Sequence, residues 1–502
     1  MQKSAQKAFD LYNQKKYTDA LKIISTLDKK FLSDENIMLL VGNCYDALAQ
    51  KSTAVKFYKK AYKINHNSES ALLNLAIAYF ELNKLSQSKK YAQQVLSINS
   101  KNYQALCVLG NICNQKKQYG NAIKFYQESI LIKKDFYQAN MNLANIYYKQ
   151  KNNAKAYFYA NRAMQICPSF PNDIKIFAQI CIELQKHEKA VPYLINMCKI
   201  KTDDYILHDL LAQIYLHQKK YDLALAEYWK ALIVSSGENS QQINFGYALY
   251  EIASVDNNKN VQKYATLWLK KYPENPVAQH MANAILNNQK ISQSNKQYVR
   301  EIFNAFAEDF EYILKHLNYN VPNILSSELD SLFKNLKPKK MKILDAGCGT
   351  GLCAFYLKKY AKIRGLDGVD ISSKMLKIAK EKKVYTHLYN QELCTFLKHH
   401  KNVYNLINAA DVFTYFGDLE SLLDFCEKSL KKNGRILFSI SENDIDESNY
   451  FLHPSGRFLH NKNYVETMLN NLGFFIEKTN RIYLRNEGEK KVFGWVFMAL
   501  KN

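Results

Sequence analysis

Three closely spaced glycines and two carboxylates that follow them are the residues of this sequence best suited to binding chemistry. Gly347, Gly349 and Gly351 lie in "ILDAGCGTGLCAFYLKKY", between an apolar run typical of a strand and a run typical of a helix. Because glycine has no Cβ, a ligand can lie directly against the backbone of such a turn. Asp370 follows about twenty residues later, where a carboxylate can accept from both hydroxyls of a ribose. Glu392, after the third strand-like run, is placed to accept from an adenine amino group. Taken alone, each acid is compatible with a solvated loop; in this order, they predict an adenosine site.

The spacing of the glycines narrows the class of nucleotide site. The sequence contains no GxxxxGK[ST], which excludes a P-loop. The glycines follow GxGxG rather than GxGxxG. This spacing disfavours a nicotinamide dehydrogenase, an alternative that predicts NADH binding.

Strand-like and helix-like runs alternate around these residues. The strand-like runs are "KILDAG", "RGLDGVDI", "VYTHLYN", "YNLINAAD", "GRILFSIS", "FFIEKTNRIYLR" and "KVFGWVFMAL". Alternation of this kind predicts a largely parallel sheet with helices on both faces and a ligand beyond the carboxyl ends of the strands. Only the turn "NEGE" separates the last two runs, so one of them should run antiparallel.

This combination of motifs resembles the class I S-adenosylmethionine-dependent methyltransferases over about residues 298–502. It most resembles the bacterial members that carry an N-terminal tetratricopeptide repeat (TPR) array. The resemblance implies an α/β Rossmann-like domain with a mostly parallel seven-stranded sheet, an enzyme that transfers methyl groups, and S-adenosyl-L-methionine as cofactor. One departure concerns the third-strand motif, which is usually Gly-Asp and is here Gln391-Glu392.

The resemblance also implies which residues bind the cofactor. Asp345 and the glycines would surround its amino acid part, Asp370 the ribose and Glu392 the adenine, while Ala409 and Asp411 would line the methyl-donor end. The expected cofactor-binding residues are Asp345, Gly347, Cys348, Gly349, Gly351, Asp370, Ile371, Met375, Glu392, Leu393, Ala409, Asp411, Tyr298 and Phe306.

Residues 298–320 are expected to form a helical lid. Tyr298, Phe306 and Phe310 would fold over the cofactor, since aromatic faces attract a sulfonium and exclude water. The alternative is that Phe306 and Phe310 belong, with Ile302 and Ile313, to an ordinary apolar helix stripe.

The acceptor side is expected in the long stretch after the fifth strand, "SENDIDESNYFLHPSGRFLHNKNYVETMLNNLG". Arg457 is suited to anchor a carboxylate or phosphate, and His453 or His460 to remove a proton, with Gly456 as a pivot. In the alternative, His460 helps to cap the next helix and Arg457 pairs with an acid such as Asp446. The expected catalytic residues are Asp411, Tyr415, His453 and His460, and the expected substrate-binding residues are Arg457 and His460. Methyl transfer chiefly needs alignment, and a carboxylate acceptor would need no base.

Several acceptors are disfavoured by the fourth strand-like run. It ends in "NAADVF" and not in the Asn/Asp-Pro-Pro-Tyr/Phe of enzymes that methylate exocyclic or amide nitrogens, and no double-glutamate loop follows. DNA adenine, glutamine and arginine are therefore disfavoured. A small molecule, or a protein side chain recruited by the repeats, remains.

The first half of the sequence has a period of 34 residues. Two tracks of small residues and one of larger residues follow this step. They are Ala8, Gly42, Ala76, Gly110, Ala144, Ala178, Ala212 and Gly246; Ala20, Ala54, Ser88, Ala122, Ala156, Ala190 and Ala224; and Leu11, Tyr45, Tyr79, Cys113, Tyr147, Cys181, Tyr215 and Leu249. Small residues let two helices approach closely. The pattern resembles the TPR and predicts an all-α superhelix over 1–287, of about eight units, with the last unit atypical because Asn258 breaks the alanine track. Residues 288–297 would be a linker and 298–502 the methyltransferase domain.

The composition of the chain limits its expected partners, metal content and cellular location. The formal net charge is +23, but it comes mostly from dispersed lysines, so nucleic acid is a disfavoured partner. No apolar stretch is long enough for a membrane span or typical of a signal peptide, and the ten cysteines lack the spacing of metal ligands. We therefore expect a cytoplasmic protein without a metal, whose repeats bind a protein or peptide. The alternative is a TPR scaffold whose second domain binds S-adenosylmethionine as a sensor or is inactive.

Overall fold

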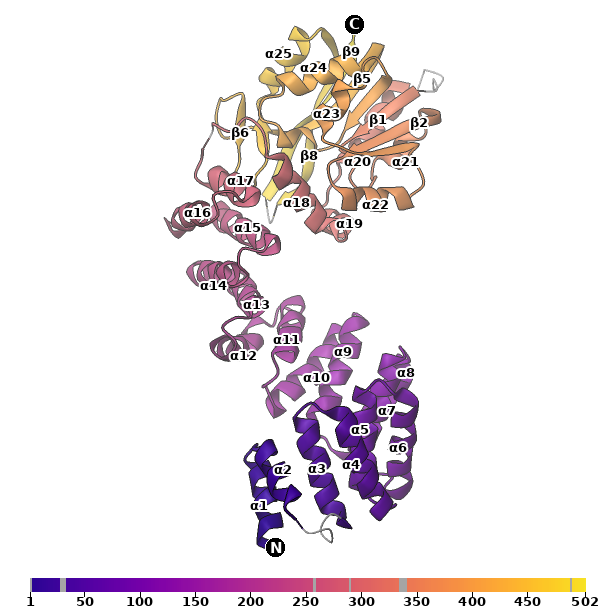
Figure 1. Cartoon of the computed structure of the whole chain (residues 1–502). Coiled ribbons are helices and arrows are strands. Elements are labelled where there is room, and N and C mark those ends of the chain that lie inside the picture. The colour runs from indigo at the N-terminus through magenta and orange to yellow at the C-terminus, as the bar shows by residue number, and fades with distance from the viewer. Residues whose placement is uncertain (1, 28–32, 256–258, 289, 334–340, 488–489) are drawn as a thin grey trace. The chain divides into compact units, whose positions relative to one another are not determined.

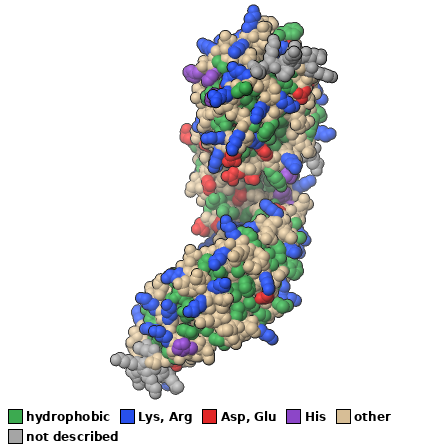
Figure 2. Space-filling view, turned by 90° about the vertical axis from the view of Figure 1, so that its right-hand side faces the viewer, with side chains coloured by type: hydrophobic (Ala, Val, Ile, Leu, Met, Phe, Trp, Pro, Cys, Tyr) green, Lys and Arg blue, Asp and Glu red, His purple; other side chains and the backbone are tan. Residues whose placement is uncertain are grey.

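The computed structural model describes residues 2–27, 33–255, 259–288, 290–333, 341–487 and 490–502. Contacts between Cα atoms divide the chain into two compact units, Met1–Thr202 and Asp203–Asn502. None of the helices in the described ranges is long and apolar enough to cross a membrane. On the face of the molecule seen in Figure 2, Lys and Arg side chains are dispersed among polar and apolar ones and do not form a continuous stripe.

The first unit consists of twelve helices in its described residues, arranged as hairpins (Figure 1). They are α1 (Gln2–Asn13), α2 (Tyr17–Ser25), α3 (Glu35–Ala47), α4 (Lys51–Ile64), α5 (Glu69–Glu81), α6 (Leu85–Ile98), α7 (Tyr103–Gln115), α8 (Tyr119–Ile132), α9 (Tyr137–Lys149), α10 (Asn153–Ile166), α11 (Pro171–Glu183) and α12 (His187–Ile200). In the next unit the pattern continues with α13 (Tyr205–His217), α14 (Tyr221–Val234), α15 (Asn239–Val255), α16 (Lys259–Lys271) and α17 (Pro276–Ile285).

Close packing inside each hairpin explains the tracks of small residues. Every member of the second track, from Ala20 to Ala224, is fully buried. A Cβ on Gly42 would lie 2.3 Å from the ring of Tyr58, and one on Gly110 2.5 Å from the ring of Tyr126. The hairpin turns repeat as well, because one residue in each has a left-handed backbone. These residues are 34 positions apart: Lys15, Ala49, Asn83, Lys117, Lys151, Gln185 and Lys219. The predicted helical repeat is confirmed, whereas Asn258 lies outside the described residues.

The remaining helices of the second unit surround a sheet. They are α18 (Lys296–Phe306), α19 (Phe310–His316), α20 (Val321–Phe333), α21 (Ala354–Leu357), α22 (Ser373–Glu381), α23 (Leu393–Lys398), α24 (Glu420–Ser429) and α25 (Lys462–Asn471), with a 3₁₀ turn at Phe413–Tyr415. The strands are β1 (Met341–Ala346), β2 (Ala361–Asp370), β3 (His387–Asn390), β4 (Tyr404–Ala409), β5 (Leu430–Glu442), β6 (Tyr450–Leu452), β7 (Phe458–His460), β8 (Phe474–Glu487) and β9 (Lys490–Lys501).

The strand order confirms the predicted mostly parallel sheet. Strands β3, β2, β1, β4 and β5 lie side by side and parallel, and β9 continues the sheet antiparallel to both β5 and β8. Neighbouring residues of β5 point to opposite faces: Phe438 packs with residues of α23, α24 and α25, and Leu437 with residues of α20 and α21. Helices therefore cover both faces (Figure 1).

Two features differ from the sequence prediction. The stretch after β5 is not wholly irregular, because it contains the short antiparallel hairpin β6–β7, whose second strand runs parallel to the end of β5. The expected lid is not one helix: α18 ends at Phe306 and α19 begins at Phe310. This break changes the directions in which the lid side chains point.

Candidate active site

The glycine turn follows β1 directly. Gly347, Gly349 and Gly351 all have left-handed φ angles, of +62°, +54° and +86°. A Cβ on Gly347 would lie 2.4 Å from Val412 Cγ2, whereas the nearest atom to a Cβ on Gly349 is a ring carbon of Phe310, 3.9 Å away. The turn therefore packs against the protein at Gly347 and faces open space at Gly349.

Asp370, the last residue of β2, holds this turn in place. Its Oδ2 accepts from the backbone N–H of Gly349 at 2.8 Å, and its Oδ1 accepts from that of Ser372 at 2.8 Å. Burial raises the pKa of Asp370, although these backbone donors act in the opposite direction. The glycine turn and Asp370, both singled out from the sequence, therefore meet at the carboxyl ends of β1 and β2.

Asp345, near the end of β1, contacts protein side chains beside the glycine turn. Its side chain is buried, and its carboxylate accepts from the hydroxyl of Tyr385 at 2.5 Å and from Asn408 Nδ2 at 3.0 Å. Burial raises the pKa of Asp345 to about 6, against the effect of these two donors. Its partners lie within the protein, so Asp345 orients the end of β1.

A cavity opens between this turn and the lid helices. The empty space there is about 1130 Å³, part of which is open solvent. The lining residues come from six parts of the second unit. They are Gln293, Ser294, Lys296, Val299, Phe303, Phe310, Leu314, Tyr319, Pro322, Gly347, Cys348, Gly349, Thr350, Leu352, Cys353, Val369, Asp370, Ile371, Gln391, Glu392, Leu393, Ala410, Asp411, Val412, Tyr415, Phe416 and Arg457.

Hydrogen bonds and an ion pair connect the lid helices α18 and α19 to residues near the ends of the strands. Glu311 of α19 accepts from Thr350 Oγ1 and pairs with Lys382, in both cases at 2.7 Å. Asn304 of α18 accepts from Ser372 Oγ at 2.8 Å. On the cavity side, the ring of Phe303 lies 5.4 Å from that of Tyr415.

The segment before α18 also lies against the cavity. The N–H of Ser294 donates to the carbonyl of Tyr415 at 3.0 Å, and the N–H groups of Gly417 and Asp418 donate to the carbonyl of Ser292. Gln293, Ser294 and Lys296 consequently line the cavity, although the sequence predicted a linker here. The polar composition of this segment did not indicate that it packs against the cavity.

Glu392 lines the cavity, but its carboxylate already has protein partners. It caps α23 by accepting from the N–H groups of Cys394 and Thr395, and it pairs with Lys296 at 3.0 Å. Burial opposes ionisation, yet these donors and the hydroxyl of Thr395 lower the pKa of Glu392 to about 2. The adenine contact of Glu392 stays a prediction.

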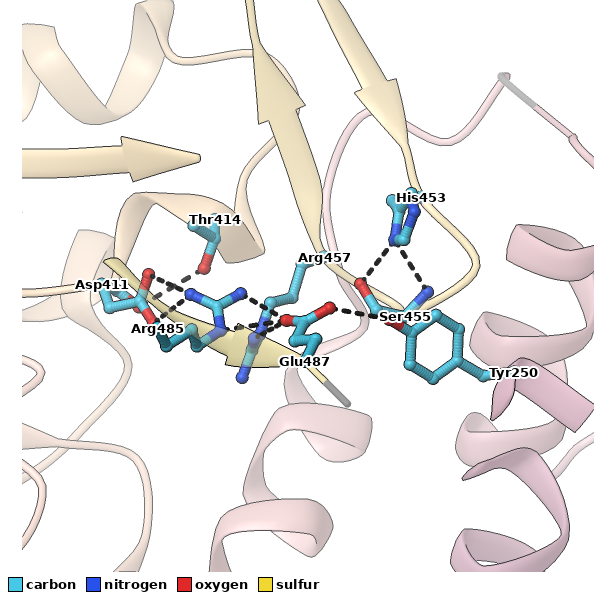
Figure 3. Close-up of polar contacts among 8 residues, drawn as sticks. All are labelled: Tyr250, Asp411, Thr414, His453, Ser455, Arg457, Arg485 and Glu487. Atoms are coloured by element: carbon cyan, nitrogen blue, oxygen red, sulfur yellow. Dashed lines mark hydrogen bonds and ion pairs between the residues drawn. The ribbon is translucent and has the colours of Figure 1, made fainter. Parts of the chain in front are cut away.

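Four charged side chains meet at the other end of the cavity (Figure 3). Arg485, which is 2% exposed, pairs with Asp411 at 3.2 Å and with Glu487 at 2.8 Å. Arg457 Nη1 donates to the same oxygen of Glu487 at 2.8 Å. Burial alone would raise the pKa of Glu487, but the two guanidiniums and the hydroxyl of Tyr250 lower it to about 2.

Asp411 has an unusual backbone at this point. Its φ is +60°, which costs a non-glycine residue about 1–2 kcal/mol, and its N–H donates to Ser439 Oγ at 2.9 Å. Strain of this kind is concentrated at functional sites, where the surrounding structure holds it. Both Asp411 and Tyr415, two of the expected catalytic residues, line the cavity.

Helices of the repeat region complete this end of the site. Tyr250 of α15 donates to Glu487 Oε2 at 2.7 Å. His280 of α17 lies 2.8 Å through Nε2 from the carbonyl of Gly456, next to Arg457. A Cβ on Gly456 would lie 2.3 Å from the hydroxyl of Tyr298, so the turn before Arg457 packs tightly against these helices.

Ten of the predicted site residues line the cavity. They are Gly347, Cys348, Gly349, Asp370, Ile371, Glu392, Leu393, Asp411, Tyr415 and Arg457. Eight others are not among its lining residues: Asp345, Gly351, Met375, Ala409, Tyr298, Phe306, His453 and His460. Met375 and Ala409 are fully buried, and Gly351 has Tyr385 within 3.0 Å of the position of a Cβ.

Of the three aromatic residues that the sequence predicted to face the cavity from the lid, Tyr298 and Phe306 do not line it. Tyr298 packs on the ring of His280 at 4.1 Å, and Phe306 packs on Tyr247 at 5.6 Å. Both therefore face the repeat helices. Phe310 of α19, the third expected residue, does line the cavity. Phe303 of α18 lines it in place of Tyr298 and Phe306, because α18 buries one side against α15 and α17 and turns the other to the cavity.

The two histidines also have positions that differ from the prediction. His460 is fully buried, and its Nε2 lies 2.8 Å from the carbonyl of Phe416. Burial lowers the pKa of His460 to about 4. His453 contacts Ser455 and the ring of Tyr250, so neither histidine contacts the cavity in the described structure. Asn461 caps α25 without His460.

Arg457 lines the cavity, but its acidic partner was not predicted. It pairs with Glu487 on β8, not with Asp446, whose partners are Asn443 and Ser448. Arg485 and Glu487 were not predicted, because the sequence analysis assigned Arg485 to a strand-like run and Glu487 to the turn after it, whereas both belong to β8. The cationic residues inside that strand were the available signal.

Family models match parts of both the repeat region and the second half of the chain. Residues 317–477 match a family model described as a methyltransferase domain. Residues 1–113 match the N-terminal TPR repeats region of Psidin, and residues 115–197 match subunit 3 of the anaphase-promoting complex, or cyclosome. The chain therefore carries N-terminal TPR-type repeats and a methyltransferase domain.

Individual relatives are similar to the second half of the chain. A demethylmenaquinone methyltransferase of Thermotoga maritima is 28% identical over 142 residues, which is 28% of this chain and 61% of the relative. A malonyl-[acyl-carrier protein] O-methyltransferase of Priestia megaterium is 29% identical over 148 residues, 29% of this chain and 52% of the relative. The chain thus spans about half to three fifths of the length of these relatives. A solved magnesium protoporphyrin IX methyltransferase of Synechocystis with bound SAH is 17% identical, with a TM-score of 0.33 over 41% of this chain and 99% of that one.

Proposed function

We propose that the chain is an S-adenosylmethionine-dependent methyltransferase, which transfers a methyl group to a small-molecule or protein acceptor, and that its TPR-type repeats bind a protein or peptide partner. The observation that carries the proposal is the open space beside Gly349, whose backbone N–H is held by Asp370. A left-handed glycine with free space before it, held by a carboxylate at the end of the neighbouring strand, suits a nucleoside with a ribose. The match to a methyltransferase domain supports this assignment.

The residues of the cavity fit an adenosyl sulfonium in three ways. The backbone at Gly349 admits close approach, and Asp370 lies where it can accept from ribose hydroxyls. Phe303, Phe310 and Tyr415 present aromatic side chains, which suit a cation and exclude water. The acidic groups Asp370 and Asp411 add negative charge.

S-adenosylmethionine, when bound, supplies a methyl group on a positively charged sulfur that is already activated for displacement. The task of this chain is then to align the acceptor in line with the S–CH₃ bond and to exclude water. We assign alignment to Arg457 and to the walls formed by Tyr415 and Tyr319, and exclusion of water to the lid residues Phe303 and Phe310.

Calorimetry with S-adenosylhomocysteine, the demethylated product, tests the binding step. We expect the unaltered protein to bind it, and Asp370→Asn to bind it about 10-fold or more weakly, because one oxygen that can accept from the ribose hydroxyls and that holds the turn is replaced by a donor. Asp424→Asn is the control, since Asp424 is an acid of α24 that pairs with Lys428 away from the cavity. No heat from the unaltered protein would remove the basis of the proposal.

Turnover separates the enzyme from the alternative function. Tritiated S-adenosylmethionine incubated with the protein and a cell extract should transfer label in a manner that depends on Asp370. Binding of S-adenosylhomocysteine without transfer to any fraction of the extract would instead support a TPR scaffold that senses the cofactor.

The remaining expectations about the whole chain belong to the same proposal. All ten cysteines are free thiols, which suits a reducing compartment such as the cytoplasm. TPR-type repeats are typical protein- or peptide-binding surfaces. We keep 1–287 as the repeat array, 288–297 as the connecting segment and 298–502 as the methyltransferase domain.

A further inference from the structure

We propose that the methyl acceptor is a carboxylic acid with an apolar body, that Arg457 binds its carboxylate, and that the product is a methyl ester. This inference rests on the proposed function and specifies its substrate class. Two independent observations carry it. Arg457 has guanidinium nitrogens without an acceptor in the described residues, and the histidines and carboxylates near the cavity are not placed to accept a proton.

Arg457 is the less exposed of the two cationic side chains that line the cavity in the described residues. The lining contains one other cation among the described residues, Lys296, which pairs with Glu392. Arg457 gives one nitrogen, Nη1, to Glu487, and within the described part of the chain its other guanidinium nitrogens have no hydrogen-bond acceptor. Arg457 shares Glu487 with Arg485 and Tyr250, so its contact with this carboxylate is through one nitrogen. A guanidinium with a free edge suits a carboxylate.

The wall around Arg457 is apolar and aromatic. Leu314, Tyr319 and Pro322 come from α19, α20 and the loop between them, and Phe303 and Tyr415 lie opposite in the lining. An acceptor bound here would bury hydrocarbon or a ring against these side chains, with its charged end at Arg457. Burial of this kind also strengthens the attraction between Arg457 and a carboxylate, because the local dielectric is low.

In the described residues, no histidine lines the cavity, and each lining carboxylate already has a partner, so neither type of side chain is a free general base for a protonated acceptor. His453 and His460 do not line the cavity. Asp411 is engaged by Arg485, Glu392 by Lys296 and the start of α23, and Asp370 by the glycine turn. A carboxylate needs no base, since it is already ionised at neutral pH.

The reaction is balanced without any further reactant. One carboxylate oxygen forms a bond to the methyl carbon as the S–CH₃ bond breaks and its electron pair returns to sulfur. A negative carboxylate and a positive sulfonium become a neutral ester and a neutral thioether. Because the two charges cancel, a site that excludes water favours the step. The neutral ester then binds Arg457 more weakly, which assists its release.

A binding experiment tests the role of Arg457 without turnover. Decanoate and its neutral isostere decanamide are titrated into the protein saturated with S-adenosylhomocysteine. We expect decanoate to bind at least 10-fold more tightly than decanamide, and Arg457→Gln to remove this preference while leaving the affinity for S-adenosylhomocysteine unchanged. Arg435→Gln is a matched control, because Arg435 pairs with Glu477 at a similar exposure but away from the cavity. Equal affinity for the acid and the amide, or the same loss in both variants, would overturn the proposal.

The chemistry of the product gives the second test. Label transferred from tritiated S-adenosylmethionine to a cell extract is treated with base, which releases methanol from methyl esters but not from N-methyl or ether products. We expect base-labile label that falls about 10- to 100-fold in Arg457→Gln and stays unchanged in Arg435→Gln. Base-stable label would refute the carboxylate acceptor and leave the methyltransferase proposal intact. No label in any fraction would refute the methyltransferase proposal itself.

Discussion

Substituting alanine at two glycines of the same turn separates folding from ligand binding. Gly347 and Gly349 both have left-handed backbones, so alanine at either position costs about 1–2 kcal/mol of conformational strain. Their surroundings differ. The new methyl group at Gly347 would lie 2.4 Å from Val412, whereas that at Gly349 would have no atom nearer than Phe310 at 3.9 Å.

The expected magnitudes follow from these distances. Gly347→Ala adds an overpacking cost of about 1–3 kcal/mol to the strain, for a total of roughly 2–5 kcal/mol. Gly349→Ala should cost about 1–2 kcal/mol. However, its methyl group occupies the gap between the turn and Phe310, where we place the cofactor. We therefore expect Gly349→Ala to bind S-adenosylhomocysteine at least 10-fold more weakly, which corresponds to about 1.4 kcal/mol.

Tryptophan fluorescence makes the stability measurement specific. The three tryptophans, Trp229, Trp268 and Trp495, all lie in the second unit, so urea unfolding followed at these residues reports on the unit that contains the site. Calorimetry without urea then gives the affinity of each variant for S-adenosylhomocysteine. If Gly349→Ala binds S-adenosylhomocysteine as tightly as the unaltered protein, the ligand does not lie against this turn. If the two variants lose equal stability, the packing argument at Gly347 is wrong.

Three further predictions concern the surroundings of the cavity. Burial holds the pKa of His460 at about 4, below the unfolded value near 6.5, so its contribution to stability is present above pH 6.5 and lost as the pH falls towards 4. Between pH 7 and 5, urea unfolding of His460→Gln should therefore show about 2 kcal/mol less loss than the unaltered protein; the raised pKa of Asp345 acts in the opposite direction in both proteins and cancels in this difference. Tyr250→Phe should raise the KM for the acceptor several-fold by loosening the support of Arg457, with the affinity for S-adenosylhomocysteine unchanged; equal kinetics would contradict this role. Phe310→Ala should weaken binding of S-adenosylhomocysteine about 3- to 10-fold by opening the lid, as calorimetry would show.

The parts of the structure that sequence predicted well depend on local chemistry. A turn of three glycines between a strand and a helix is determined by residues within about ten positions, and the 34-residue repeat by small residues within one hairpin. Lys15, Ala49 and Asn83 show how regular this local geometry is, because each takes a left-handed backbone at the same place in its repeat. Asp370 was found for a similar reason, since the length of a βαβ unit places it beside the turn.

The parts that sequence did not predict depend on distant partners. Arg457 pairs with Glu487, thirty positions later, and that glutamate is shared with Tyr250, more than two hundred positions earlier. Likewise, the apolar stripe of α18 does not reveal which aromatic residue faces which neighbour. Tyr298 turns to the repeat helices and Phe303 to the cavity only because α15 and α17 occupy one side of α18.

These distant contacts explain why the compact second unit begins inside the repeats. Each repeat of a solenoid contacts only its neighbours, so such an array has no single strong boundary of its own. In contrast, Ala278 and Met281 of α17 share one apolar cluster with Tyr298 and Ile302 of α18. The last repeat helices are thus built into the same core as the lid, and through Tyr250 and His280 they also hold the residues around Arg457. A methyltransferase domain cut at the end of the repeat pattern would lose the contacts of Tyr250 and His280 with the residues around Arg457, so the final repeats belong physically to the site that we propose for the acceptor.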